Sequence, residues 1–152
     1  MSVVNVQLTA GKPYSLRGDQ TAGFSTHWVR SRTAVVTVCG ELDAANARQF
    51  AEYAMGHISH SKKLVLDLMA VGFFSVSCFP ALHNLNLRRG REGVGWVLVP
   101  SAAVARVLHV CDPGGQLPIE ATVVAALSAL RGSRATGSNT AAEASAEAFF
   151  AV

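Results

Sequence analysis

Short apolar runs alternate along the chain with segments in which apolar residues recur every three or four positions. The runs contain many β-branched residues and few polar ones, a pattern typical of strands, and the continuous runs indicate a sheet covered on both faces. We predict strands over 24–30, 33–39, 63–69, 94–99 and 117–119.

The segments with helical spacing follow these strands. Asp43 is a suitable N-cap for the first helix, and Gly90 is placed to end the second. We predict helices over 44–58, 78–89, from Pro100-Ser101 to the turn at 112–115, and over 121–130. Because strands and helices alternate with short connections, the pattern predicts one small α/β domain, a β-sheet flanked by about four α-helices.

The two ends of the chain lack this alternation. Residues 1–22 have mixed composition with Gly and Pro, and we interpret them as an N-terminal arm. Residues 133–152 are rich in Ala, Ser and Thr, a composition that buries little apolar area, so a flexible C-terminal tail is expected. The folded domain is therefore predicted to span 23–132.

Composition narrows the class of protein. Half of the residues are hydrophobic and 15% are charged, as in globular proteins, and the net charge is +3 without a long basic run. We therefore expect no nucleic acid partner. No apolar run reaches the roughly 18 residues of a membrane span, and no signal peptide is recognised, so we expect no membrane insertion and a cytoplasmic location. The widely spaced Cys39, Cys78 and Cys111 indicate neither disulfides nor a zinc site.

No arrangement of residues indicates catalysis. The sequence contains no nucleophile motif, no phosphate-binding glycine loop, and no histidine pair at metal-ligand spacing among His57, His60, His83 and His109. We therefore expect a binding protein rather than an enzyme, with no cofactor and no metal.

The segment FFSVSCFPAL, residues 73–82, joins a strand to a helix and holds the candidate chemistry. Ser77 precedes the helix that Pro80 opens, so it is either the N-cap or a serine whose phosphate the helix dipole would stabilise. Ser75 is a loop hydroxyl or a second candidate acceptor. Cys78 is either a thiol activated by the helix start or a small buried hydrophobe, and the second is favoured.

Two carboxylates allow similar alternatives. Asp43 either caps the first helix or contacts a partner. Asp67 lies in an apolar strand, where a buried charge needs partners. We expect Asp67 near the strand end, with its carboxylate bound by backbone donors.

Several motifs in order resemble the STAS domain, the module of bacterial anti-sigma factor antagonists and of sulphate transporter termini. They are GELDAANA, LVLDLMAVGFFSVS, RRGREG, WVLV and PSAAVARVL, within residues 24–131. The resemblance implies a small mixed β-sheet with flanking helices. It also implies a partner, an anti-sigma factor that in this family can be a serine kinase.

In the antagonist branch, the loop entering the second helix typically reads Asp-Ser-Ser-Gly, and phosphorylation of its first serine releases the anti-sigma factor. On that pattern Ser75 takes the Asp place, Val76 the phosphoacceptor place, Ser77 the second serine and Cys78 the Gly. The usual switch is thus expected to be absent. The resemblance places the partner-binding surface at Asp43, Ser75, Val76, Ser77 and Phe79, with Ser77 and Ser75 as candidate phosphoacceptors.

Two further hypotheses stay open. Some STAS domains bind nucleotides or lipids, and exposed Phe73, Phe74 and Phe79 would favour such a sensor here. A homodimer could form through an edge strand at 24–30.

Overall fold

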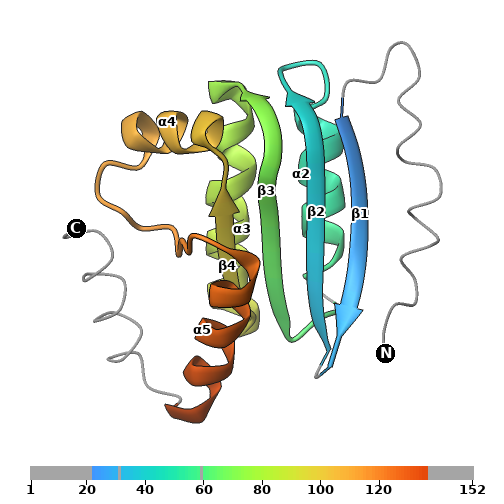
Figure 1. Ribbon diagram of the computed structural model, residues 1–152, viewed down its shortest axis with the longest axis vertical. Coiled ribbons are helices and arrows are strands. Elements are labelled where there is room, and N and C mark those ends of the chain that lie inside the picture. The colour runs from blue at the N-terminus through green and yellow to red at the C-terminus, as the bar shows by residue number, and fades with distance from the viewer. Residues whose placement is uncertain (1–21, 31, 59, 137–152) are drawn as a thin grey trace.

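A mixed sheet forms the centre of the molecule (Figure 1). The computed structural model describes residues 22–30, 32–58 and 60–136, of which 133–136 are described by their backbone alone. The strands are β1 (Ala22–Val29), β2 (Thr33–Leu42), β3 (Lys63–Phe74) and β4 (Gly95–Pro100), in the spatial order β1-β2-β3-β4. β2, β3 and β4 are parallel, and β1 is antiparallel to β2. The predicted arm and tail lie almost wholly outside the described residues.

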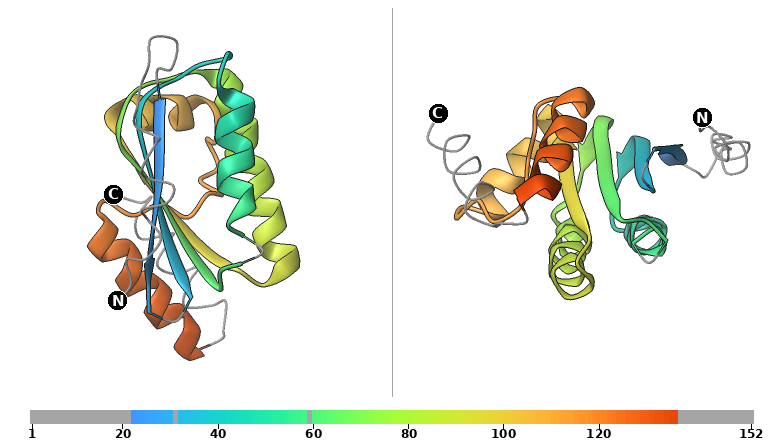
Figure 2. Two further views of the ribbon diagram at one scale, coloured as in Figure 1. Left: turned by 90° about the vertical axis from the view of Figure 1, so that its right-hand side faces the viewer. Right: turned by 90° about the horizontal axis from the view of Figure 1, so that it is seen from below.

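Helices cover both faces of this sheet (Figure 2). They are α2 (Ala47–Gly56), α3 (Phe79–Glu92), α4 (Ala102–Cys111) and α5 (Val123–Thr136). α2 and α3 connect successive parallel strands and lie on one face, α5 lies on the other, and α4 lies beside the carboxyl end of β4. The predicted α/β class, with a mixed sheet and flanking helices, is confirmed.

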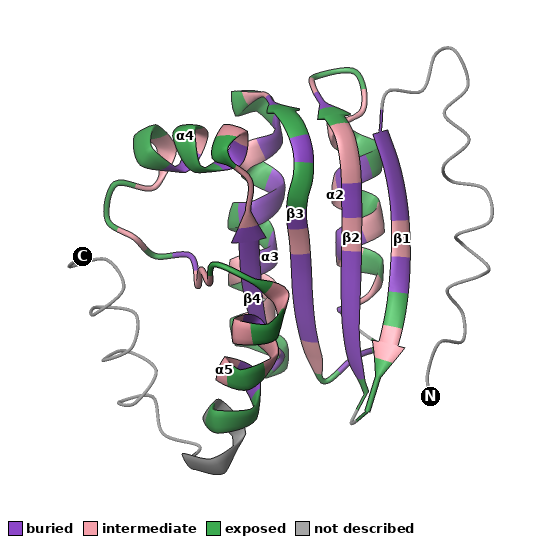
Figure 3. Ribbon diagram, viewed as in Figure 1, coloured by how far each residue is buried: buried purple, intermediate pink, exposed green. Residues whose placement is uncertain are grey.

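Consecutive residues are buried along much of β2, β3 and β4 (Figure 3), and because successive side chains point to opposite faces of the sheet, they enter two different cores. Under α2 and α3 lies the larger core, which includes Val36, Val38, Leu64, Leu66, Leu98, Phe50, Leu82 and Leu85. Under α5 lies a smaller core of Val35, Val65, Val97, Val99, Ala126 and Leu130. The continuous apolar runs in the sequence thus correspond to strands with both faces covered, as predicted.

The start of α2 differs from the prediction. The helix begins at Ala47 and not at residue 44, because residues 44–46 form a turn. Asp43 binds the amides of that turn, while the N-cap of the helix is Asn46, whose side chain makes no capping bond. The prediction that Asp43 caps the helix itself was wrong.

The end of α3 also differs. Gly90 lies inside the helix, and Gly93 ends it in the left-handed conformation, with φ 69° and its N–H donated to the Arg89 carbonyl. A glycine takes this conformation without the steric cost that a Cβ brings. The prediction that Gly90 ends the helix was therefore wrong, because Gly93, the next glycine in the sequence, ends it.

The C-terminal third is close to its prediction. Ser101 caps α4, its Oγ accepting a hydrogen bond from the Val104 amide at 3.2 Å, and the turn at 112–115 follows, with the Gly115 amide donating to the Asp112 carbonyl at 3.0 Å. The predicted strand 117–119 is only a single parallel bridge between Ile119 and Leu98.

None of the helices in the described ranges is both long and apolar enough to cross a bilayer.

Candidate functional site

Two loops meet where β2 and β3 end. We call residues 40–46, which include the last three residues of β2, the GELD loop, and residues 75–78 the switch loop. The Ser75 amide donates to the Leu42 carbonyl at 2.9 Å, and the Cys78 thiol lies 3.5 Å from the Asp43 carbonyl oxygen. The carboxyl ends of neighbouring parallel strands share one edge of a sheet, so sequence-distant segments are brought together. The structure thus brings the two loops into contact.

Side chains fix the shape of the GELD loop. Asp43 Oδ1 accepts hydrogen bonds from the amides of Ala45 at 3.0 Å and Asn46 at 3.4 Å. In return, Asn46 Oδ1 accepts from the Asp43 amide at 2.9 Å, and its Nδ2 donates to the Glu41 carbonyl at 3.0 Å. The sequence analysis did not identify Asn46. The spacing of Asp43 and Asn46, three residues apart, is a signal for this pair of reciprocal hydrogen bonds between side chain and backbone.

The switch loop contains a short 3₁₀-helix, η1 (Val76–Cys78), before α3 begins at Phe79. Ser75 is its N-cap: its Oγ accepts from the Ser77 amide at 3.1 Å and lies 2.8 Å from Ser77 Oγ. The N-cap residue of α3 is Cys78, without a side-chain bond. The prediction that Ser77 caps the helix was therefore wrong, because η1 is inserted between strand and helix and moves the cap back to Ser75.

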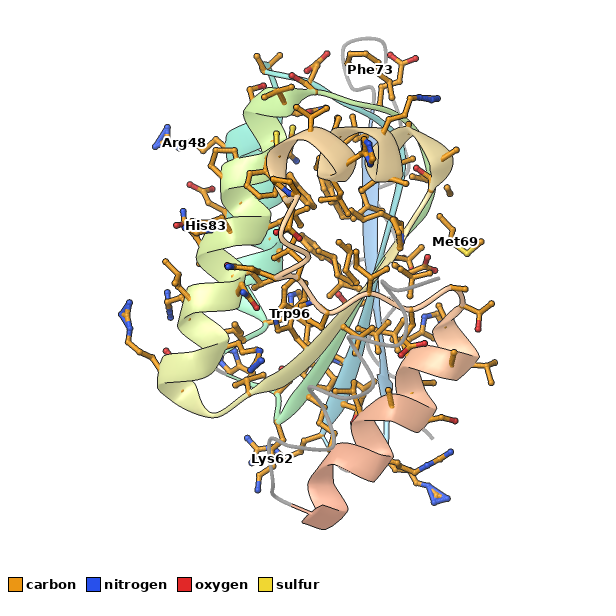
Figure 4. All side chains as sticks on the ribbon, turned by 90° about the vertical axis from the view of Figure 1, so that its left-hand side faces the viewer. Arg48, Lys62, Met69, Phe73, His83 and Trp96 are labelled. Carbon is orange, nitrogen blue, oxygen red and sulfur yellow. The ribbon has the colours of Figure 1, made fainter. Side chains whose placement is uncertain are left out.

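Val76 is the most exposed apolar side chain of this loop, with 61% of its surface accessible. Phe73, at the adjoining end of β3, is 50% exposed, and Figure 4 shows it at one extremity of the molecule. Ser77 is also exposed and Ser75 is partly buried. The exposed apolar surface of Val76 and Phe73 does not contribute to the stability of the isolated chain. Contact with another molecule that covers both side chains would remove this surface from water, which is favourable.

The other two phenylalanines of the segment have different surroundings. Phe74 is buried and packs edge-to-face on Phe50, with ring centroids 6.2 Å apart. Phe79 is partly buried and stacks on His83, with ring centroids 6.3 Å apart. The prediction that all three phenylalanines are exposed was wrong for Phe74, which weakens the case for an aromatic ligand site around this loop.

Cys78 lies beneath the loop and is fully buried. Burial, with a smaller contribution from the negative charge of Asp43, raises the pKa of its thiol to about 11, against a lowering by the backbone of Ser75. The group is therefore protonated at neutral pH, and thiols react as thiolates. The interpretation of Cys78 as a small buried hydrophobe is confirmed.

Asp67 lies further from this edge than predicted. β3 continues to Phe74, so Asp67 is not near the strand end. Its Oδ1 accepts a hydrogen bond from the Met69 amide at 3.0 Å, beside an irregularity in the pairing of β2 with β3. The expectation of a backbone donor is confirmed.

Among residues 22–30, 32–58 and 60–132, no three His, Cys, Asp or Glu side chains are grouped as they would be to hold a metal ion. The loop edge presents the exposed side chains of Val76 and Phe73 beside the hydroxyl groups of Ser75 and Ser77.

Comparison with known proteins agrees with this geometry. The family model for the STAS domain matches residues 28–126, which include both loops. The chain belongs to the STAS domain family. The resemblance noted in the sequence is thus confirmed.

Named relatives of this STAS domain come from Mycobacterium tuberculosis. Anti-sigma-F factor antagonist RsfA is 32% identical over 99 residues, which are 62% of this chain and 77% of RsfA. Osmosensory protein A of strain H37Rv is 38% identical over 81 residues, which are 53% of this chain and 51% of that protein. The chain therefore spans about half the length of this second relative.

Solved structures give the same fold. An anti-sigma factor antagonist from Mycobacterium paratuberculosis superposes with a TM-score of 0.66 at 25% identity, covering 73% of this chain and 95% of the other. The antagonist SpoIIAA in its unphosphorylated form superposes with a TM-score of 0.57 at 20% identity, covering 72% and 97%. The second likeness concerns the fold alone.

Proposed function

We propose that this STAS domain binds an anti-sigma factor, of the kind that can also be a serine kinase, and so regulates the availability of a sigma factor. The contact surface consists of residues from the GELD loop, the switch loop and the start of α3, namely Asp43, Ser75, Val76, Ser77 and Phe79. Support comes from the relative named anti-sigma-F factor antagonist and from the hydrogen bonds that hold the two loops together. The chain acts in the cytoplasm in this proposal, in line with Cys39, Cys78 and Cys111 being free thiols.

One observation carries the mode of regulation. Val76 stands at the phosphoacceptor place of the family pattern and is 61% exposed, so an accessible hydrocarbon replaces the hydroxyl that a kinase would modify. A phosphoryl group added there in relatives brings a charge of almost −2, which opposes docking against an acidic or apolar partner surface. Without an acceptor, that release step is absent and binding is constitutive.

Binding should depend on the apolar character of Val76. We expect Val76→Asp to weaken binding to the anti-sigma-F factor of Mycobacterium tuberculosis at least about tenfold, because the partner would have to desolvate a carboxylate. Isothermal titration calorimetry measures this. Val124→Asp is the matched control, since Val124 is 74% exposed on α5, which lies on the face of the sheet opposite α2 and α3. Equal affinities of wild type and Val76→Asp would show that Val76 does not belong to the contact surface. Failure of wild type to bind would contradict the proposal that the partner is an anti-sigma factor of this kind.

Phosphorylation is tested separately. When the chain is incubated with the same anti-sigma factor and ATP, we expect intact mass spectrometry to show no phosphate on wild type. Val76→Ser restores the acceptor hydroxyl and should take up one phosphoryl group, with looser binding as a result. Stoichiometric phosphate on Ser75 or Ser77 of wild type would show that the switch has been moved by one residue, and constitutive binding would then be rejected.

A further inference from the structure

The outward side of α3 carries apolar side chains. The residues of this helix that are buried in the larger core are Ala81, Leu82 and Leu85. Because an α-helix has 3.6 residues per turn, its opposite side includes Pro80, His83 and Leu87, all of which are exposed. Leu87 has 52% of its surface accessible. The outward side of a surface helix is typically charged or polar, so α3 departs from the usual pattern.

The neighbouring helix follows the usual pattern. α2 lies beside α3 on the same face of the sheet (Figure 2). Its exposed residues include Arg48 and Glu52, which form an ion pair with 3.3 Å between Arg48 Nε and Glu52 Oε2. The apolar outward side is therefore a property of α3 and not of this whole face of the molecule.

Three side chains of α3 form a row. Phe79, His83 and Leu87 are four residues apart, a spacing that places side chains one above the other along a helix. The rings of Phe79 and His83 are stacked, with 6.3 Å between their centroids, and Figure 4 shows His83 on the side of α3 that faces away from the sheet. We call these three residues the α3 ridge. With a rise of about 1.5 Å per residue, the ridge is roughly 12 Å long.

The α3 ridge is continuous with the proposed partner surface. Phe79 belongs to both, and Val76, which is 61% exposed, precedes it in η1. A protein that covers Val76 and Phe79 therefore lies next to His83, and one helical turn further it reaches Leu87. Single exposed apolar side chains are common on protein surfaces. What distinguishes Leu87 is that it extends, along one helix, a surface for which a partner is already proposed.

The spacing of the row indicates which partner structure fits it. On a helix surface, side chains four residues apart form a ridge, and such ridges pack into the grooves of a second helix with about 8–10 Å between the axes. An amphipathic helix presents apolar residues at i, i+3 or i+4 and i+7, which span a similar length of surface. The stacked rings of Phe79 and His83 hold each other in place before binding, so little side-chain freedom is lost when they are covered.

We propose that the α3 ridge extends the partner-binding surface and contacts an amphipathic helix of the anti-sigma factor. The inference rests on the proposed function, because the partner is the one proposed for the two loops. The switch loop supplies the contact at Val76, and the ridge adds His83 and Leu87, which the family pattern in the sequence did not indicate. The apolar side of the partner helix covers Leu87.

Calorimetric titration of the full chain with the anti-sigma-F factor of Mycobacterium tuberculosis tests the ridge. We expect Leu87→Asp to weaken binding at least about fivefold, because the partner helix would have to desolvate a carboxylate. Leu87→Gln, which adds no charge, should weaken binding about threefold through the loss of apolar contact. Since Leu87 is exposed, both variants should fold, and urea unfolding checks this.

The matched control is Val124→Asp, which places the same charge at another exposed apolar position, on α5. It should change the affinity less than twofold. If it weakens binding as much as Leu87→Asp does, the effect comes from added charge alone and the ridge is overturned.

The outcomes separate this inference from the proposed function. If wild type does not bind, both are overturned. If wild type binds and Val76→Asp weakens binding, while both Leu87 variants bind as wild type does, the loops stay the contact surface and the ridge is overturned. Loss of self-association in Leu87→Asp, measured by analytical ultracentrifugation without a change in affinity for the anti-sigma factor, would assign the ridge to a second copy of this chain and would also reject the proposal.

Discussion

At the scale of single residues, a polar network attaches the edge strand β1 to α2. His57 Nδ1 is 2.8 Å from the Tyr53 carbonyl, an acceptor only, so Nδ1 carries the proton and Nε2 accepts. Thr26 Oγ1, 3.0 Å from that Nε2, therefore donates to it and accepts in turn from the Tyr53 hydroxyl at 2.9 Å. Each polar group of the network has a partner when the imidazole is neutral.

This network predicts a loss of stability in mild acid. Burial, with a smaller contribution from the positive charge of His60, lowers the pKa of His57 below its ordinary value of about 6.5, although its bond to the Tyr53 backbone raises it. Below about pH 6.5, His57 therefore takes up a proton more readily in the unfolded chain than in the folded chain. The stability of the folded state is therefore full above about pH 6.5 and falls as the pH drops below it.

Urea unfolding of wild type and variants between pH 8 and pH 5 measures this effect. We expect His57→Gln to be less stable at pH 8 and to lose less free energy of unfolding on acidification than wild type. His60→Gln, at an exposed position, serves as the control and should retain most of the wild-type loss. An equal loss in His57→Gln and wild type would show that other groups cause the acid sensitivity.

At the scale of elements, the two glycines of RRGREG have opposite roles. Gly93 ends α3 with a positive φ, and alanine there should destabilise the fold by about 1–2 kcal/mol. Gly90 lies within the helix with open space at its Cβ position, and alanine should stabilise by about 0.5–1 kcal/mol. The free energies of unfolding of the two variants check this. A stabilising Gly93→Ala, or two changes of the same sign, would contradict the assigned helix end.

The same pair shows what local sequence patterns can specify. The existence and order of the central strands and helices were predicted, because each has its own period of apolar residues. The end of α3 was not predicted correctly, since Gly90 and Gly93 look equivalent in the sequence. Only the position at which β4 pairs with β3 from Gly95 onward shows where the helix must end.

At the scale of the whole molecule, the sheet separates two unequal cores. α2 and α3 cover the larger one, whereas α5 contributes only Ala126 and Leu130 as fully buried side chains among its residues up to 132. Since local opening is easiest where few apolar contacts hold an element, we expect amides of α5 to exchange hydrogen faster than those of β3 and α3. Native-state hydrogen exchange followed by NMR measures it, and equal protection would contradict the two-core description.

The surface is also divided between two ends. The partner surface predicted at Asp43, Ser75, Val76, Ser77 and Phe79 lies at the carboxyl ends of the parallel strands, and the cavity lined by Lys62 and Arg89 lies at their amino ends. Self-association through β1 stays a prediction. Within the described part of the chain β1 pairs with β2 alone, so it is an edge strand of the sheet.

The sequence by itself determined the alternation of strands and helices, which follows from the spacing of apolar residues along the chain. Its ordered motifs also carried the resemblance to the STAS domain, which the family model confirms. The tertiary structure decided that Ser75 rather than Ser77 is the cap, that Phe74 is buried, and that Lys62 and Arg89 share a cavity. The physical reason is that burial and charge clustering depend on which distant segments the sheet brings together, and no local period records that pairing.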